Sequence, residues 1–244
     1  IGNLQSMVDE LDKALNDVER ITKEYGEFAY IVSHDFAAPL RHVREFTRLL
    51  LASTNEELNE EQQEYKDFVD RSLDKLDGMQ NSMLTFSRIN TQGAEFTQTE
   101  TAKLVESALA LLDTEIKDSD ANVEFENLPS VKADTNQLQT VFFELISNGI
   151  KFHREGVPAA VTVSAQSAND EVTFTVEDNG IGIEEGHYES VFKLFRSLHP
   201  DTDYPGMGTG LTIAQKIVER HNGKMWVESV VDQGTKIMFT LPVS

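Results

Sequence analysis

Hydrophobic positions in the first part of the chain recur with helical spacing. Between residues 4 and 32 they are separated alternately by four and three residues, which is the spacing of a coiled-coil seam. The positions are Leu4, Val8, Leu11, Leu15, Val18, Thr22, Tyr25, Ala29 and Val32. Because the helical pattern continues as far as Leu51, we expect one long helix here, paired with the same helix of a second chain.

A second helical pattern follows a short polar interruption. Residues 53–57 carry no apolar side chain, and helical spacing resumes between Tyr65 and Phe86. Two long helices joined by a short turn form a hairpin, and two hairpins associate as a four-helix bundle. Residues 1–90 are therefore predicted to form an N-terminal coiled-coil helix and an α-helical hairpin that dimerises.

The pattern changes after residues 89–93, which have the composition of a linker. From Phe96 onward, alternating apolar and polar residues, typical of strands, are interspersed with helical patterns. Strands are predicted at 96–100, 123–126, 161–166, 172–176, 225–230 and 236–241, and helices at 102–116, 134–152 and 209–221. Helices that cover one face of a mixed sheet form an α+β sandwich, which is the fold predicted for a second domain at residues 96–244.

The charge of the chain limits its partners. Its 244 residues include 21 Lys and Arg but 42 Asp and Glu, which gives a formal net charge of −21. Such a surface repels a polyphosphate backbone, so nucleic acid is not expected as a partner. The sequence has no Cys, and no apolar run approaches the roughly 20 residues of a membrane-spanning helix. We therefore expect a soluble protein without thiolate chemistry or membrane insertion.

Three polar residues on the predicted helix 134–152 suit a metal and a phosphate group. Glu144, Asn148 and Lys151 lie within two helical turns on nearly one face. The first two side chains offer oxygen ligands for Mg²⁺, and the third offers a cation for phosphate.

Two glycine-containing segments extend this cluster. Asp178-Asn179-Gly180-Ile181-Gly182 follows a predicted strand and places a carboxylate beside glycines that allow close approach of a planar ligand. Gly206-Met207-Gly208-Thr209-Gly210-Leu211 opens a predicted helix, whose N-terminal amides attract an anion. Between them, the segment from Phe192-Lys193-Leu194-Phe195-Arg196 to Tyr204-Pro205 is a candidate lid. Each segment alone also fits an ordinary turn, but their order along the chain favours one binding site.

A histidine with an adjacent acid lies on the first predicted helix. In Ser33-His34-Asp35, the Asp35 carboxylate can hydrogen-bond one imidazole nitrogen of His34. This contact fixes the tautomer and leaves the other nitrogen as a nucleophile.

With these motifs in this order, the sequence resembles the catalytic core of the sensor histidine kinases over essentially its whole length. In that family a dimerisation and histidine-phosphotransfer hairpin precedes an ATP-binding domain of the Bergerat type, which is shared with gyrase, the heat-shock chaperone and mismatch-repair ATPases. The phrase Val191-Phe192-Lys193-Leu194-Phe195-Arg196-Ser197-Leu198-His199, followed by Tyr204-Pro205-Gly206, is most similar to phytochrome-related members.

The resemblance implies a role for each motif residue. Asp178 would accept a hydrogen bond from the adenine amino group of ATP, Asn148 would bind Mg²⁺, and His34 would be the phosphoacceptor, with Asp35 beside it. The base would lie near Gly180, Gly182 and Phe152, the phosphates near Lys151, Arg196, Gly206, Gly208, Gly210 and Leu211, and Phe192 and Phe195 would anchor the lid.

Two positions depart from the family pattern. Ala38 stands where many members carry Thr or Asn, which orients the water that dephosphorylates the response regulator, so we expect weak phosphatase activity. Glu144 stands where many members have Asn, and a glutamate at this place activates water in the Bergerat ATPases. Glu144 is therefore a candidate for a second Mg²⁺ ligand or for a catalytic base.

Together these observations predict a protein-histidine kinase that depends on ATP and Mg²⁺. It would act in the cytoplasm as a homodimer, phosphorylate His34, and pass the phosphoryl group to an aspartate in the receiver domain of a response regulator. A sensor domain outside this chain would control it. Two alternatives stay open: a nonenzymatic phosphorelay or scaffold module with a degenerate ATP domain, and an ATPase of the gyrase or chaperone kind.

Overall fold

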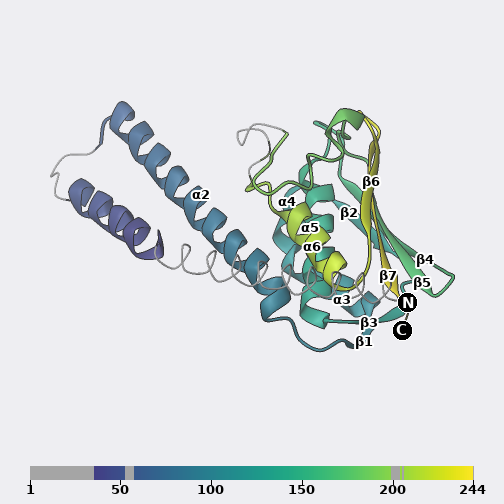
Figure 1. Cartoon of the computed structure of the whole chain (residues 1–244). Helices are drawn as coiled ribbons and strands as arrows, with labels where there is room; N and C mark the ends of the chain where they lie inside the picture. The colour runs from purple at the N-terminus through teal and green to yellow at the C-terminus, as the bar shows by residue number, and fades with distance from the viewer. Residues whose placement is uncertain (1–35, 53–57, 199–203, 205, 244) are drawn as a thin grey trace. The chain divides into compact units, whose positions relative to one another are not determined.

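The chain divides into two compact units, residues 1–92 and residues 93–244 (Figure 1). The computed structural model describes residues 36–52, 58–198, 204 and 206–243. The predicted coiled-coil seam, His34, Asp35, the polar turn at 53–57 and most of the tip of the lid lie outside these residues. No helix in the described ranges is both long and apolar enough to cross a membrane.

The described parts of the first unit are helical, as the spacing predicts. Residues 36–52 are helical, and α2 (Glu60–Thr91) follows. Asn59 begins α2 with a capping box, in which its side chain accepts from the Gln62 amide and the Gln62 side chain accepts from the Asn59 amide. Arg44 joins the two helices by donating to Asp74 at 2.8 Å and to Asp77 at 2.7 Å. The predicted hairpin is thus confirmed.

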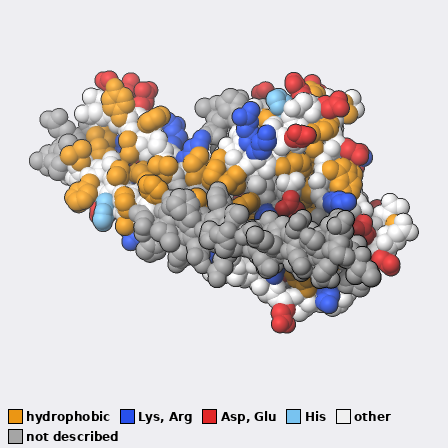
Figure 2. All heavy atoms as spheres, in the orientation of Figure 1, with side chains coloured by type: hydrophobic (Ala, Val, Ile, Leu, Met, Phe, Trp, Pro, Cys, Tyr) orange, Lys and Arg blue, Asp and Glu red, His pale blue; other side chains and the backbone are white. Residues whose placement is uncertain are grey.

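Large apolar side chains are exposed along both helices of the hairpin (Figure 2). They are Phe36, Val43, Phe46, Leu49, Leu50, Tyr65, Phe68 and Leu76, each between 46% and 69% exposed. An apolar stripe at helical spacing is typical of a surface that another helix covers.

A mixed five-stranded sheet forms the base of the second unit. Its strands lie in the order β2-β4-β5-β7-β6, with β2 parallel to β4 and the other neighbours antiparallel. They are β2 (Asn122–Phe125), β4 (Ala160–Ala168), β5 (Glu171–Asp178), β6 (Met225–Val230) and β7 (Gly234–Pro242). A separate antiparallel pair is formed by β1 (Thr97–Glu100) and β3 (Ser130–Ala133).

Helices cover one face of this sheet (Figure 1). The helical elements of this unit are α3 (Thr101–Leu111), α4 (Asp113–Asp118), α5 (Thr135–Lys151), the short 3₁₀ helix η1 (Glu185–His187) and α6 (Gly210–Arg220). The helix α5 lies between α3 and α6 and contacts β4 and β5. Phe142 of α5 packs against Phe174 of β5 and Phe239 of β7, with ring centroids 5.6 and 5.8 Å away. The predicted sandwich is confirmed.

The alternation on either side of Asn169-Asp170 predicts a hairpin, which the structure confirms, but two details elsewhere differ from the prediction. Asn169 and Asp170 both have positive φ, as a two-residue hairpin turn requires. The single helix predicted at 102–116 is wrong, because Leu112 leaves helical geometry at ψ 10° and separates α3 from α4. The strand β3 was not predicted, since four residues carry too short an alternation to be recognised.

A buried polar cluster fixes the start of the second unit to both α5 and α6. Asp134 begins α5 by accepting from the Gln137 amide, and it also accepts from the Ala94 amide at 2.7 Å and from Arg220 at 3.2 Å. Arg220 in turn donates to the Ala94 carbonyl. His221 is buried, and its Nε2 accepts from the Asp134 amide at 3.0 Å, so it serves a structural role.

Substituting Asp134 with Ala tests this cluster. Asp134 is only 3% exposed, and its removal leaves Arg220 without its carboxylate partner and α5 without its cap. We expect the free energy of unfolding of this unit to fall by about 3 kcal/mol. Urea denaturation followed by the fluorescence of Trp226, the single tryptophan, reports on this unit alone. Asp113→Ala removes an exposed ion pair with Lys117 and should cost less than about 0.5 kcal/mol; equal losses in the two variants would contradict the assignment.

Candidate active site

A carboxylate at the end of β5 is held by two backbone amides. The Oδ1 atom of Asp178 accepts from the Gly180 amide at 2.8 Å and from the Thr235 amide at 3.1 Å. Among the described residues, no donor bonds to the other oxygen, Oδ2. Burial raises the pKa of Asp178 to about 6, although both amides act in the opposite direction. The group is therefore an oriented acceptor in a partly dry environment.

Glycines surround this carboxylate on several sides. A Cβ atom on Gly180 would stand 2.8 Å from Asp178 Oδ1, and one on Gly149 of α5 would stand 3.3 Å from Asp178 Cβ. A Cβ on Gly234, at the start of β7, would collide with the Asp178 carbonyl oxygen. Side chains at these positions would crowd the acceptor, so the glycines keep open a slot of the kind that a flat ligand needs.

The loop after β5 connects this slot to the end of α5. The Ile181 amide donates to the Phe152 carbonyl at 3.0 Å, and a Cβ on Gly180 would collide with the same carbonyl oxygen. Gly182 has φ 71° and lies against the Val230 carbonyl oxygen, where a Cβ would also collide. The sequence-predicted Gly180, Gly182 and Phe152 thus lie together beside Asp178.

The polar face of α5 meets the glycine segment that opens α6. A Cβ atom on Gly210 would collide with Glu144 Oε2, and a Cβ atom on Gly206 would collide with Lys151 Nζ. Burial raises the pKa of Glu144, while the positive charge of Lys151 lowers it. Asn148 is half-buried on α5, one turn after Glu144. The structure therefore brings the predicted metal- and phosphate-binding residues to one place.

Aromatic rings lie next to the ammonium group of Lys151. Its Nζ stands 4.5 Å from the centroid of the Phe152 ring, and the Phe152 and Tyr204 rings are 5.1 Å apart. The Tyr204 hydroxyl donates to the His153 carbonyl at 3.2 Å. These contacts connect the described end of the candidate lid to the end of α5.

The base of the candidate lid is attached to α6. The Thr212 hydroxyl donates to the Phe192 carbonyl at 2.8 Å, and a Cβ on Gly208 would stand 2.5 Å from the Arg196 carbonyl oxygen. Phe195 is 38% exposed and adopts φ 61°, a conformation that costs a bulky residue energy. Leu211 is half-buried in the first turn of α6.

Sequence reasoning missed the contribution of β7 to the site. The amide of Thr235 holds Asp178, and Gly234 leaves room for it. A turn was evident in Asp232-Gln233-Gly234, but only the sheet order, which places β7 beside β5, brings this turn to Asp178. No pattern within the sequence gives that order.

The residues present fit a nucleotide with Mg²⁺. A flat slot with one oriented acceptor suits a base that carries an amino group, and Lys151 near a helix N-terminus suits phosphates. In the described ranges, no three His, Cys, Asp or Glu side chains gather to hold a metal ion. Mg²⁺ needs no such cluster, because it binds through one or two protein ligands together with substrate phosphates and water. Glu144 and Asn148 meet that requirement.

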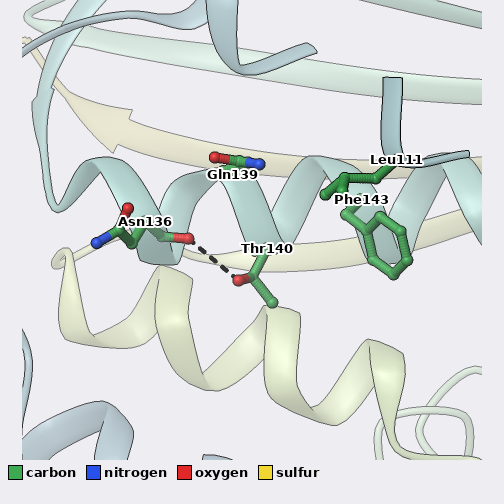
Figure 3. A pocket seen from close by; sticks show the side chains of 5 residues that line it. All are labelled: Leu111, Asn136, Gln139, Thr140 and Phe143. Atoms are coloured by element: carbon green, nitrogen blue, oxygen red, sulfur yellow. Dashed lines mark hydrogen bonds between the residues drawn. The ribbon is translucent and has the colours of Figure 1, made fainter. Parts of the chain in front are cut away.

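A separate hollow of about 260 Å³ lies on the outer face of α5 (Figure 3). It is lined by Leu111, Asn136, Gln139, Thr140 and Phe143. The Thr140 hydroxyl donates to the Asn136 carbonyl in its own helix, and no lining residue is charged. The hollow therefore offers nothing to neutralise a phosphate group, and it shares no residue with the site above.

Two family models match the chain. The model described as His Kinase A (phospho-acceptor) domain matches residues 24–92. The model described as Histidine kinase-, DNA gyrase B-, and HSP90-like ATPase matches residues 133–244. Cyanobacterial phytochrome A from Nostoc sp. strain PCC 7120 is 36% identical over 96% of this chain and 31% of its own length. The chain thus spans about a third of the length of that relative.

Solved structures of histidine kinases share the fold. Full-length ShkA in complex with AMPPNP is 25% identical, with a TM-score of 0.66 over 89% of this chain and 46% of that chain. Histidine kinase ThkA in complex with the response regulator protein TrrA is 21% identical, with a TM-score of 0.64 over 96% of this chain and 66% of that chain. The order of the two matched domains and the phytochrome relative show that the chain belongs to the histidine kinase family, as a phospho-acceptor domain followed by an ATPase domain.

Proposed function

We propose that this chain is the phosphotransfer core of a two-component sensor histidine kinase, which phosphorylates His34 from ATP. The observation that carries the proposal is the arrangement of one site from distant segments. Asp178 and its glycines form one end, and Glu144, Lys151 and the glycine segment before α6 form the other. The phospho-acceptor match over residues 24–92 includes His34 and Asp35.

Each end of the site would bind a different part of ATP. Asp178 Oδ2 would accept the adenine amino group, because Oδ1 is already used by two amides. Gly149, Gly180, Gly182 and Phe152 would border the base. Lys151, Arg196 and the backbone of Gly206, Gly208 and Gly210 would neutralise and orient the phosphates, while Phe192, Phe195 and Leu211 would support the lid.

The chemical step would be an in-line displacement at the γ-phosphorus. One imidazole nitrogen of His34 forms the new N–P bond as the bond to the β–γ bridging oxygen breaks, and ADP leaves with that electron pair. Asp35 would accept a hydrogen bond from the N–H of the other ring nitrogen and stabilise the positive charge that develops on the imidazole. The phosphoryl group then passes from His34 to an aspartate carboxylate of the receiver domain.

Glu144 and Asn148 would hold Mg²⁺ on the phosphates. When bound, Mg²⁺ offsets the charge that develops on the phosphate oxygens during transfer. Glu144 has a second candidate role as a general base, because burial raises its pKa above the ordinary value of a carboxylate. This observation also favours an alternative function, an ATPase of the gyrase or chaperone kind that hydrolyses ATP without labelling the protein.

The proposed partners follow from the hairpin and the relatives. The exposed stripe that includes Val43, Phe46, Leu50 and Phe68 suits a second copy of the hairpin in a four-helix homodimer. The relative ThkA was solved with a response regulator protein, which supports a receiver domain as the phosphoryl acceptor. Cyanobacterial phytochrome A is about three times as long, which supports control by a sensor domain. Because ATP is the donor, we place the reaction in the cytoplasm.

Incubation with Mg²⁺ and γ-labelled ATP tests the proposal directly. We expect acid-labile label on the wild-type protein and none on His34→Ala or Asn148→Ala. His42→Ala, eight residues after His34 in the sequence, and Asn136→Ala, on the same helix as Asn148, are exposed controls that should keep the label. Release of phosphate without protein label would favour the ATPase alternative, and neither label nor release in folded protein would favour the scaffold.

Substituting Glu144 with Gln separates its two roles. If Glu144 acts as a base, the rate of His34 phosphorylation should fall by at least about a hundredfold, with little change in ADP affinity. Glu155→Gln makes the same chemical change at an exposed loop position and should leave the rate unchanged. An unchanged rate for Glu144→Gln would exclude the base role, and a loss confined to Mg²⁺ dependence would assign it to the metal.

Nucleotide affinity should decrease as the pH falls through about 6. The Asp178 carboxylate must be ionised to accept the adenine amino group, and its pKa is raised to about 6, so acid protonates the acceptor. Below that pH, affinity for ADP should fall by up to about tenfold per pH unit. Asp178→Asn keeps an acceptor for the two amides but has no group that titrates. Dividing the wild-type affinity by the affinity of this variant at each pH cancels the effect of the ionisation of ADP itself. A ratio independent of pH would contradict the role.

A further inference from the structure

Ser229 lies one strand pair away from the adenine-binding carboxylate. It is in β6, directly opposite Thr235 of β7. The amide of Thr235 donates to Asp178 Oδ1 at 3.1 Å, so the position of Thr235 sets the orientation of the carboxylate. A contact that fixes Thr235 therefore acts on the acceptor without touching the base.

The Ser229 hydroxyl makes hydrogen bonds through its one donor and both of its acceptor positions. Its Oγ accepts from the Ile183 amide at 2.8 Å and donates to the Gly234 carbonyl at 2.8 Å. It also lies 3.0 Å from Thr235 Oγ1. A hydroxyl has one donor and two acceptor positions, so the Thr235 hydroxyl is the donor in this last contact. One side chain thus fixes the loop after Gly182, the turn before β7 and Thr235.

Tyr188 holds the backbone of the same residue from the other side. Its hydroxyl donates to the Ser229 carbonyl at 2.5 Å and accepts from the Ser229 amide at 2.9 Å. Because β6 is the last strand of its sheet, these backbone groups face outward, where an edge strand has no neighbour. Tyr188 follows η1 and leads towards Phe192, so it joins β6 to the base of the lid.

We propose that Ser229, held by Tyr188, is a positioning residue that orients Asp178 to select nucleotides by their adenine amino group. The inference rests on the proposed function, since it concerns the same site. Ser229 touches neither substrate nor the reacting atoms; it acts through Thr235. The charge of Glu177 acts on Asp178, and Glu177 pairs with Lys236 across β5 and β7 at 3.1 Å. Changes at Ser229, in β6, leave this ion pair in place.

The ratio of the affinities for two nucleotides reports on the orientation of the Asp178 carboxylate. ADP and the diphosphate of purine riboside differ only in the 6-amino group that Asp178 would accept. In the full chain, Ser229→Ala should weaken ADP binding about tenfold and leave the analogue unaffected, so the affinity ratio approaches one. Because a looser Thr235 amide also stabilises the ionised Asp178 less, the pH at which ADP affinity declines should rise.

Three further variants complete this comparison of nucleotide affinities, which is made by calorimetry. Ser229→Thr keeps the hydroxyl and should keep the wild-type affinity ratio, and Tyr188→Phe should change the ratio in the same direction as Ser229→Ala. Ser107→Ala, which removes a hydroxyl bonded only to its own helix, should have no effect. A wild-type ratio in folded Ser229→Ala, or in Tyr188→Phe if the former does not fold, would overturn the inference. Failure of the wild-type protein to bind ADP would instead overturn the proposed function.

Discussion

The packing of α5 against the sheet fixes every distance within the site. The helix carries Glu144, Asn148 and Lys151, whereas Asp178 stands at the end of β5. Phe142 of α5 packs on Phe174 and Phe239, which stack on each other with centroids 5.0 Å apart. All three side chains are fully buried, so neither layer can slide without opening a cavity. The aromatic core therefore holds the two ends of the site in place, together with the hydrogen bond from the Ile181 amide to the Phe152 carbonyl.

The charge close to the site is opposite in sign to the net charge of the whole chain. A formal charge of −21 repels an anionic ligand at long range, and salt screens this repulsion over about 8 Å at physiological ionic strength. Close to the site, Lys151 stands beside Gly206, and the N-terminus of α6 adds a positive dipole. Under the proposed function, these short-range groups and Mg²⁺ would offset the overall field, which opposes the binding of phosphates.

The sequence was sufficient where the information is local. The alternation in β4 and β5 and the Asn169-Asp170 turn give a correct hairpin, and helical spacing gives α2, α5 and α6. It was also sufficient to single out Glu144, Lys151, Asp178 and the glycine segments, which lie together in the structure. It was insufficient where a residue acts through sheet order. Thr235, Ser229 and Gly234 are ordinary strand and turn residues until β7 pairs with β5. The break at Leu112 likewise leaves no mark in the apolar spacing.

The polar cluster around Asp134 shortens the connection between the two units. Both the amide and the carbonyl of Ala94 are bonded within the second unit, and the helix α2 ends at Thr91, with the Gln92 amide still bonded to Arg88. Only Gln92 and Gly93 then lie between the end of α2 and the first residue that the cluster bonds. The ATPase unit is thus joined to α2 by a link of two residues rather than by a long, free linker.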